Sequence, residues 1–118
     1  MESRRVGPVV SRATFQALRR PAGRARQGPL QVRWVPLPDG AGEVQVAYAI
    51  SKRCGDAVRR NRIRRRTKSA IALVSQGIPA GAYLITTEAE VATMNFQELT
   101  DRVASALARA GAASGERA

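Results

Sequence analysis

The chain has 118 residues, 44% of them hydrophobic and 25% charged, which is enough for one globular domain and too few for two. Its twenty Lys and Arg residues exceed its nine Asp and Glu residues by eleven, and histidine is absent. The positive excess indicates a polyanionic partner, such as nucleic acid or an anionic membrane surface. The lack of histidine excludes Ser-His-Asp and Cys-His catalytic sites, imidazole metal ligands and a histidine general base.

Cysteine content and hydropathy indicate the cellular compartment of the protein. Cys54 is the sole cysteine, so neither an intrachain disulfide nor a zinc cluster is expected. No apolar run approaches the roughly 18 residues of a transmembrane helix, and residues 1–15 lack the apolar stretch of a signal peptide. These features predict a cytoplasmic protein with no membrane partner.

The first thirty residues contain one expected helix between irregular segments. Residues 1–10 are basic and weakly patterned, so they are expected to form a loosely held N-terminal arm. Ser11 is a suitable N-cap for a short helix. Glycine and proline then interrupt residues 21–29, which predicts an Arg-rich connector. The side chains of the short helix that are expected to face the core are Thr14, Phe15 and Leu18.

Two alternating segments follow the connector. Residues 30–35 place Leu30, Val32 and Trp34 on one face, and residues 44–50 alternate in the same way. Between them, residues 36–42 contain Pro-Asp-Gly, a sequence typical of a turn. Two strands around a short loop predict a hairpin.

The second half of the chain predicts two helices and a strand. Asp56 is a plausible N-cap for a helix that continues to about Gln76, and residues 82–86 are short, apolar and typical of a buried strand. Asn95 and Glu98 have the spacing of a capping box at the start of a last helix. The element order predicts an α+β domain over residues 11–110, followed by a flexible tail at residues 111–118.

The positive charge is concentrated between Ser51 and Lys68. These eighteen residues contain nine Lys and Arg and a single carboxylate, Asp56, so they carry eight of the eleven net positive charges. Like charges four residues apart on a helix, such as Arg60 and Arg64, repel by a few tenths of a kcal/mol. A bound polyanion would relieve that repulsion, and arginine binds phosphate bidentately.

A run of charges can also be a solvated helix face, and a basic amphipathic helix can lie on a membrane. The apolar stripe of this helix, from Ile63 to Val74, is narrow and suits packing on a sheet rather than insertion into lipid. Nucleic acid is therefore the favoured partner. The residues on the helix face away from Ile63 and Ile71 are Arg60, Asn61, Arg64, Arg65 and Lys68.

Residues 49–66 closely resemble the signature of the bacterial ribonuclease P protein subunit. That family carries a strand ending in Ser-Lys-Lys/Arg, a Gly-Asn-Ala-Val turn and an Arg-Asn-Arg helix, which here is Arg60-Asn61-Arg62. The likeness extends to Phe15 in the first helix and to residues 94–99, which read Met-Asn-Phe-Gln-Glu-Leu. An eighteen-residue block in the right element order is far more specific than an isolated Arg-Asn-Arg.

The resemblance implies a fold and a topology. The family fold is a single two-layer α+β domain, similar to ribosomal proteins, in which a small mixed sheet packs against helices. The strand at 44–50, the helix at 56–76 and the strand at 82–86 would form a left-handed βαβ unit. General rules make such a crossover right-handed in about 98% of cases, so periodicity alone points the other way.

The resemblance also implies a function. Family members bind a large catalytic RNA, and the ribonucleoprotein, an endoribonuclease, removes the 5′ leader from precursor tRNA. The RNA supplies the catalysis and holds the Mg²⁺, so no catalytic or metal-binding side chain and no obligate protein partner are expected in this chain. The alternative is a structural RNA-binding protein of the ribosomal type, which would share the basic helix but has no reason to carry the whole block.

Two groups of contact residues follow from the resemblance. The RNA subunit would be bound by Lys52, Arg53, Arg60, Asn61, Arg62, Arg64, Arg65 and Lys68. The single-stranded leader of the precursor would lie in a cleft between the first helix and the sheet, lined by Phe15, Leu18, Arg19, Gln31 and Arg33. At Arg19 and Arg33 other family members often have aromatic residues, and a leader could meet the guanidinium plane of Arg33 in place of a ring.

Overall fold

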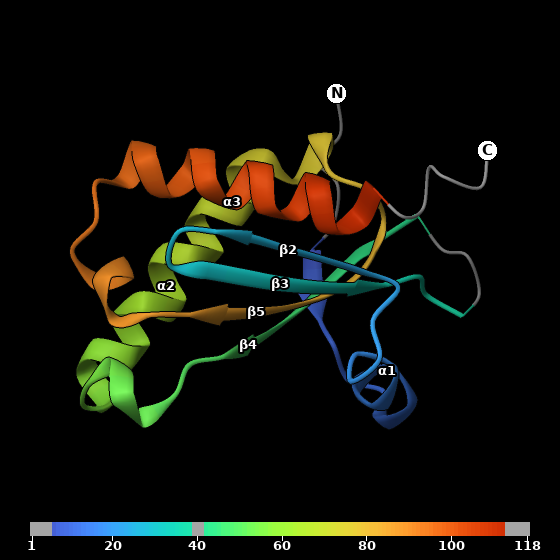
Figure 1. The fold of residues 1–118 in the computed structure, drawn as a ribbon, viewed down its shortest axis with the longest axis horizontal. Coiled ribbons are helices and arrows are strands. Elements are labelled where there is room, and N and C mark those ends of the chain that lie inside the picture. Colours follow the sequence, from blue (N-terminus) through green and yellow to red (C-terminus); the bar gives the residue numbers. More distant parts are fainter. Residues whose placement is uncertain (1–5, 39–41, 113–118) are drawn as a thin grey trace.

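A mixed five-stranded sheet runs through the computed structural model, which describes residues 6–38 and 42–112. Its order is β1-β4-β5-β3-β2, with β1, β4 and β5 parallel and β3 antiparallel to both β5 and β2 (Figure 1). The strands are β1 (Val6–Pro8), β2 (Gly23–Gln27), β3 (Leu30–Val35), β4 (Val44–Ala49) and β5 (Gly81–Thr87).

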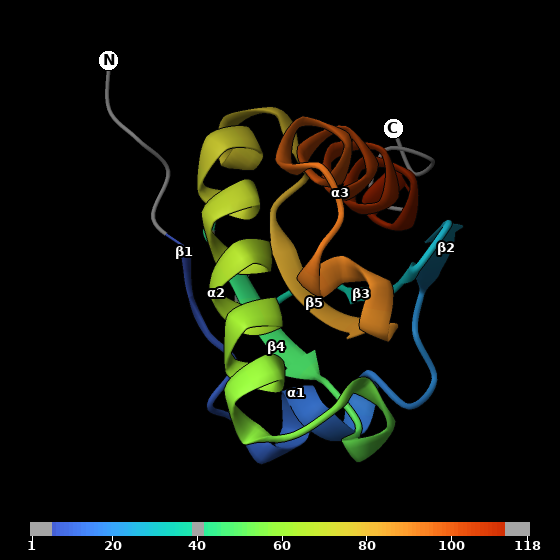
Figure 2. The same cartoon turned by 90° about the vertical axis from the view of Figure 1, so that its left-hand side faces the viewer.

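Helices cover the two faces of this sheet unequally. The long helices α2 (Ala57–Val74) and α3 (Phe96–Gly111) pack side by side on one face, where they bury the main core (Figures 1 and 2). The short helix α1 (Arg12–Ala17) covers part of the other face. The main core includes Val32, Trp34, Val46, Ile63, Ile71, Tyr83, Ile85, Leu99, Val103 and Leu107.

The connection from β4 through α2 to β5 is left-handed. The two strands are parallel neighbours, and in Figure 2 they run toward the viewer with β5 above β4 and α2 on the left. The chain therefore turns clockwise while it advances toward the viewer. This is the topology that the family resemblance implies and that general connection rules disfavour.

The predicted helix starts are confirmed at three side chains. Ser11 Oγ accepts from the Thr14 backbone N–H at 3.4 Å, and Asp56 Oδ1 accepts from the Arg59 N–H at 2.9 Å. Asn95 Oδ1 accepts from the Glu98 N–H at 3.0 Å. Each cap satisfies a backbone donor that the helix leaves unpaired, which explains why these helices begin where they do.

The predicted hairpin between residues 30–35 and 44–50 is wrong. Strand β5 lies between β3 and β4 and pairs with both, so the two segments do not pair with each other. The predicted connector at 21–29 is also wrong, because it contains β2, which pairs with β3. Strands β2 and β3 form a hairpin whose two-residue turn is Gly28-Pro29. Gly28 has a φ of 58°, which glycine adopts without strain.

The predicted N-terminal arm, at residues 1–10, and the predicted C-terminal tail, at residues 111–118, are described by the structure only in part. Val6–Pro8, which the sequence assigns to the basic arm, form the edge strand β1 beside β4, and Val9 is buried. The central residues of the Pro-Asp-Gly turn, at 39–41, and most of the predicted tail, at 113–118, lie outside the described residues.

Candidate nucleic-acid interface

Helix α2 divides sharply into a buried and an exposed side. Ile63, Thr67, Ala70 and Ile71 face the sheet and are fully buried, which fixes how the helix is turned about its axis. Most of the cations at the other positions therefore face solvent. The exposed residues among those predicted to bind RNA are Lys52, Arg53, Asn61, Arg62, Arg64, Arg65 and Lys68.

Arg60 has a structural contact besides its place in the basic block. Its side chain is half-buried, and its Nε donates to the carbonyl oxygen of Gly55 at 3.2 Å. Gly55 ends the short 3₁₀ turn Lys52–Cys54 that carries the first two basic residues. Arg60 thus holds the turn and the helix start together, which places Lys52 and Arg53 beside the basic side of α2.

Arg66 is half-buried and makes structural contacts with a neighbouring segment. Its Nε donates to the carbonyl oxygen of Val91 at 3.1 Å, and its Nη2 donates to that of Met94. These carbonyls belong to the segment that leads into α3, so Arg66 fastens α2 to it. The sequence-based site omits Arg66, in agreement with this position.

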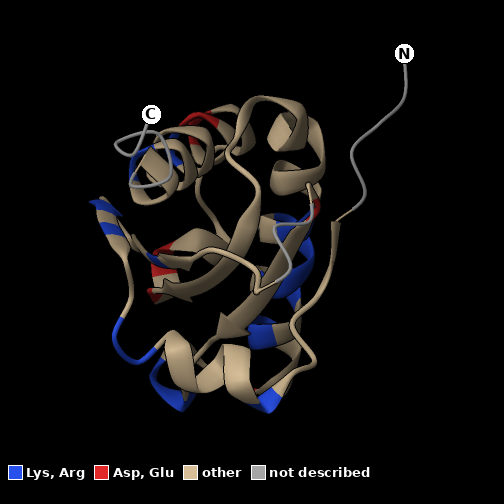
Figure 3. Cartoon of the chain, turned by 90° about the vertical axis from the view of Figure 1, so that its right-hand side faces the viewer, with Lys and Arg blue, Asp and Glu red and all other residues tan. Residues whose placement is uncertain are grey.

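Acidic groups are sparse around the basic side of α2. Figure 3 shows Lys and Arg gathered on α2 and also at the ends of α1 and along β2. Asp56 is the one carboxylate within the basic block, and its charge is taken up at the helix N-terminus. No three Cys, Asp or Glu side chains among residues 6–38 and 42–112 come together in a way that would hold a metal ion.

The sheet face opposite α2 and α3 carries the predicted leader cleft. Leu18 packs there on Val35, Leu37 and Ala82 and is only 1% exposed, so it anchors α1 and does not line a surface. Phe15, in contrast, is 45% exposed, and its predicted place in the core is wrong.

Beyond the part covered by α1, this sheet face is open. Gln31 is exposed, and Arg33 is half-buried because its Nη1 donates to the Leu18 carbonyl oxygen at 3.3 Å. Arg33 and Gln31 pair with Leu84 and Thr86 of β5. Arg19 is exposed after α1, where it lines a hollow with Arg20 and Pro36. The predicted cleft residues other than Leu18 thus lie around one surface.

Two aromatic residues beside the basic block are missing from the sequence-based site. Phe96, the first residue of α3, is 37% exposed and lines a hollow with Arg62, Arg65 and Ser69. Tyr48 lies between α2 and β1 next to Arg64. In the sequence, each of these aromatic residues occupies a position expected to face the core. That they lie beside the basic helix follows only from the packing of the elements.

The fold defines the class of protein. It matches the RNase P protein from Thermotoga maritima with a TM-score of 0.75 at 15% identity, over 86% of this chain and 96% of that one. It matches the RNase P protein of Staphylococcus aureus with a TM-score of 0.70 at 18% identity, over 85% and 91% of the two chains. The domain therefore has the fold of bacterial ribonuclease P proteins.

Sequence comparison gives the family itself. The model of the ribonuclease P family matches residues 3–111, so the chain belongs to that family. The ribonuclease P protein component of Thermus brockianus is 34% identical over 98 residues, which are 82% of this chain and 56% of that protein. The chain thus spans about half the length of the curated relatives it matches. No helix in the described part of the chain is long and apolar enough to cross a bilayer.

Proposed function

We propose that this chain is the RNA-binding protein subunit of ribonuclease P, which acts with a catalytic RNA to remove the 5′ leader from precursor tRNA. The observation that carries the proposal is the basic side of α2, in a chain that belongs to the ribonuclease P family. The buried residues of α2 fix the orientation of the helix, so its exposed arginines present their guanidinium groups to solvent, where they can bind phosphate.

We assign the chemical step to the RNA and RNA binding to the protein. Endonucleolytic hydrolysis needs an activated water, which Mg²⁺ held by the RNA would supply. Among the described residues no three Cys, Asp or Glu side chains gather into a metal-binding cluster, and we assign the ion to the RNA. The protein's contribution is to neutralise phosphates and to position the two RNA chains.

The precursor tRNA would meet a different surface from the RNA subunit. The open sheet face near α1 offers Phe15 for stacking and Arg33 as a guanidinium plane held by the Leu18 carbonyl. Because α2 covers the opposite face of the sheet, a leader and the catalytic RNA could bind at the same time. This is the arrangement that an adaptor between two RNA chains needs.

The dependence of RNA affinity on salt tests the interface. If α2 and its flanking turn make 6–10 phosphate contacts, affinity for a ribonuclease P RNA should fall by roughly 10³–10⁵ between 50 and 200 mM salt. The double variant Arg62→Ala, Arg65→Ala should reduce the salt slope by about two contacts. The matched control, Arg24→Ala with Arg109→Ala, removes the same charge from exposed positions outside α2 and should leave the slope nearly unchanged. Equal losses in both variants would show a nonspecific charge effect and contradict the assignment to α2.

A further inference from the structure

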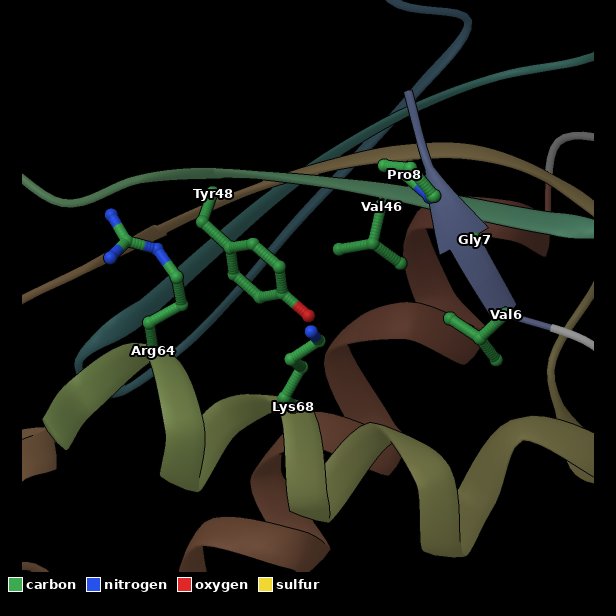
Figure 4. Close-up of a pocket in the computed structure, with 7 residues that line it drawn as sticks. All are labelled: Val6, Gly7, Pro8, Val46, Tyr48, Arg64 and Lys68. Atoms are coloured by element: carbon green, nitrogen blue, oxygen red, sulfur yellow. The ribbon is translucent and has the colours of Figure 1, made fainter. Parts of the chain in front are cut away.

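A pocket of about 310 Å³ lies between β1, β4 and α2, next to the basic side of the helix. Its volume is at the lower end of the roughly 300–1,000 Å³ typical of small-ligand sites. Val6, Val46 and the Tyr48 ring give it apolar walls. Figure 4 shows the end of Lys68 beside the Tyr48 hydroxyl and the guanidinium of Arg64 on the other side of the Tyr48 ring. The lining residues, among which there is no carboxylate, are Val6, Gly7, Pro8, Val46, Tyr48, Arg64 and Lys68.

The Tyr48 hydroxyl is available to a ligand. Within the described residues it makes no hydrogen bond, and Figure 4 shows it pointing from β4 toward the end of Lys68. Burial raises the pKa of Tyr48 to about 12, although the charge of Arg64 lowers it. The phenol is therefore neutral near pH 7, where it both donates and accepts hydrogen bonds.

Arg64 and Lys68 bring two positive charges to the mouth of the pocket. They are four residues apart on α2, both are exposed, and neither forms an ion pair within residues 6–38 and 42–112. Like charges at this spacing repel in a helix. An anionic group on Lys68 would reduce the repulsion, and it would lie beside the Tyr48 hydroxyl and the apolar wall.

We propose that this pocket binds one unpaired nucleotide of the RNA partner, with its phosphate on Lys68 and its base between Val6 and the Tyr48 ring. This combination favours a nucleotide over a bare phosphate because a base has a flat apolar face and polar edges, which suit the ring and its hydroxyl. The inference rests on the proposed function, since RNA is the ligand. It adds a base-binding site to a helix otherwise suited to phosphate contacts.

Nucleotide-resolution mapping tests the pocket. The full chain is bound to a ribonuclease P RNA transcript, and the 2′-hydroxyl reactivity of every nucleotide is measured with and without protein. The wild-type chain should change the reactivity of one unpaired nucleotide. Tyr48→Phe should weaken RNA binding about two- to tenfold, as expected for one lost hydrogen bond. Val6→Phe fills the pocket and should abolish the signal at that nucleotide.

Arg62→Met is the control, because Arg62 lies on the other flank of α2 and does not line the pocket. It should weaken binding and leave the reactivity of the pocket nucleotide unchanged. Thermal unfolding of each variant separates misfolding from lost contact, and Tyr48→Phe retains the packed ring. If both pocket variants bind with wild-type affinity and an unchanged map, the pocket inference is overturned and the proposed function stands. If the wild-type chain itself does not bind the RNA, both fall together.

Discussion

The guanidinium carbon of Arg66 lies 5.9 Å from the centroid of the Phe96 ring, which joins the middle of α2 to the first residue of α3. A cation at this distance from an aromatic face is attracted to it. Because the same guanidinium donates to the Val91 and Met94 carbonyls, one arginine in the middle of the basic block stabilises the fold.

Arg66→Met should therefore lower the free energy of unfolding by about 2–3 kcal/mol, through the loss of charged hydrogen bonds and of the contact with the ring. Arg65→Met is the matched control, because Arg65 is exposed and should change stability by no more than about 0.5 kcal/mol. Urea unfolding measures both variants. Equal stability of the two would show that Arg66 is an ordinary surface residue.

Two substitutions of Asp56 distinguish its role as the N-cap of α2 from the effect of its negative charge. Asp56→Ala should destabilise the chain by about 1 kcal/mol, because the Arg59 N–H loses its acceptor. Asp56→Asn keeps an acceptor and removes the one negative charge of the block, so it should preserve stability and raise RNA affinity. Thermal unfolding and RNA titration read the two effects independently. A drop in RNA affinity for Asp56→Asn would argue against phosphate contacts at this end of α2.

Leu18 and Phe15 should behave oppositely although both belong to the predicted leader cleft. Leu18→Ala removes a side chain that is 1% exposed and should cost about 2–5 kcal/mol of stability. Phe15→Ala should cost far less, since 45% of that residue is exposed, and should weaken binding only of precursors that retain a leader. Unfolding curves, together with titrations of precursor and mature tRNA, test this. Equal loss of affinity for both tRNA forms would place Phe15 outside a leader site.

Tyr48 makes stability fall at high pH. Its pKa is raised to about 12 from an ordinary value of 10.0, so folding favours the neutral phenol. Below about pH 10 both states hold the proton and the contribution is complete, and between about pH 10 and 12 it is lost as the unfolded chain ionises first. Urea unfolding across that range should show a steeper decline for the wild type than for Tyr48→Phe. Parallel curves would mean that the phenol is not held in a buried environment.

Local sequence signals predicted the helices and their caps correctly, and they failed at the sheet pairing. Ser11, Asp56 and Asn95 act within one helical turn, so residue type and spacing reveal them. Strand pairing depends on segments far apart in the chain. The insertion of β5 between β3 and β4 joins residues about fifty positions apart, and no local pattern encodes it.

Gly23–Gln27 illustrates the second limit. The prolines and glycines around it are typical of a connector, yet the segment between them is the edge strand β2. Gly23 is needed there because a Cβ would lie 1.8 Å from the Ala110 carbonyl oxygen of α3. The same limit applies to the site. The sequence alone shows that positive charge is concentrated in the α2 block. That Arg60 and Arg66 also have structural roles follows only from the backbone carbonyls to which they donate.

Cleavage of precursor tRNA by a reconstituted complex tests the central claim most directly. The full chain, a ribonuclease P RNA and a precursor with its 5′ leader are combined at a low magnesium concentration, chosen so that the RNA alone gives little cleavage, and the released leader is quantified. We predict that the chain restores cleavage, that the chain without RNA cleaves nothing, and that Arg62→Ala with Arg65→Ala restores much less at the same protein concentration. Unchanged cleavage on addition of the wild-type chain to a competent RNA would contradict the account.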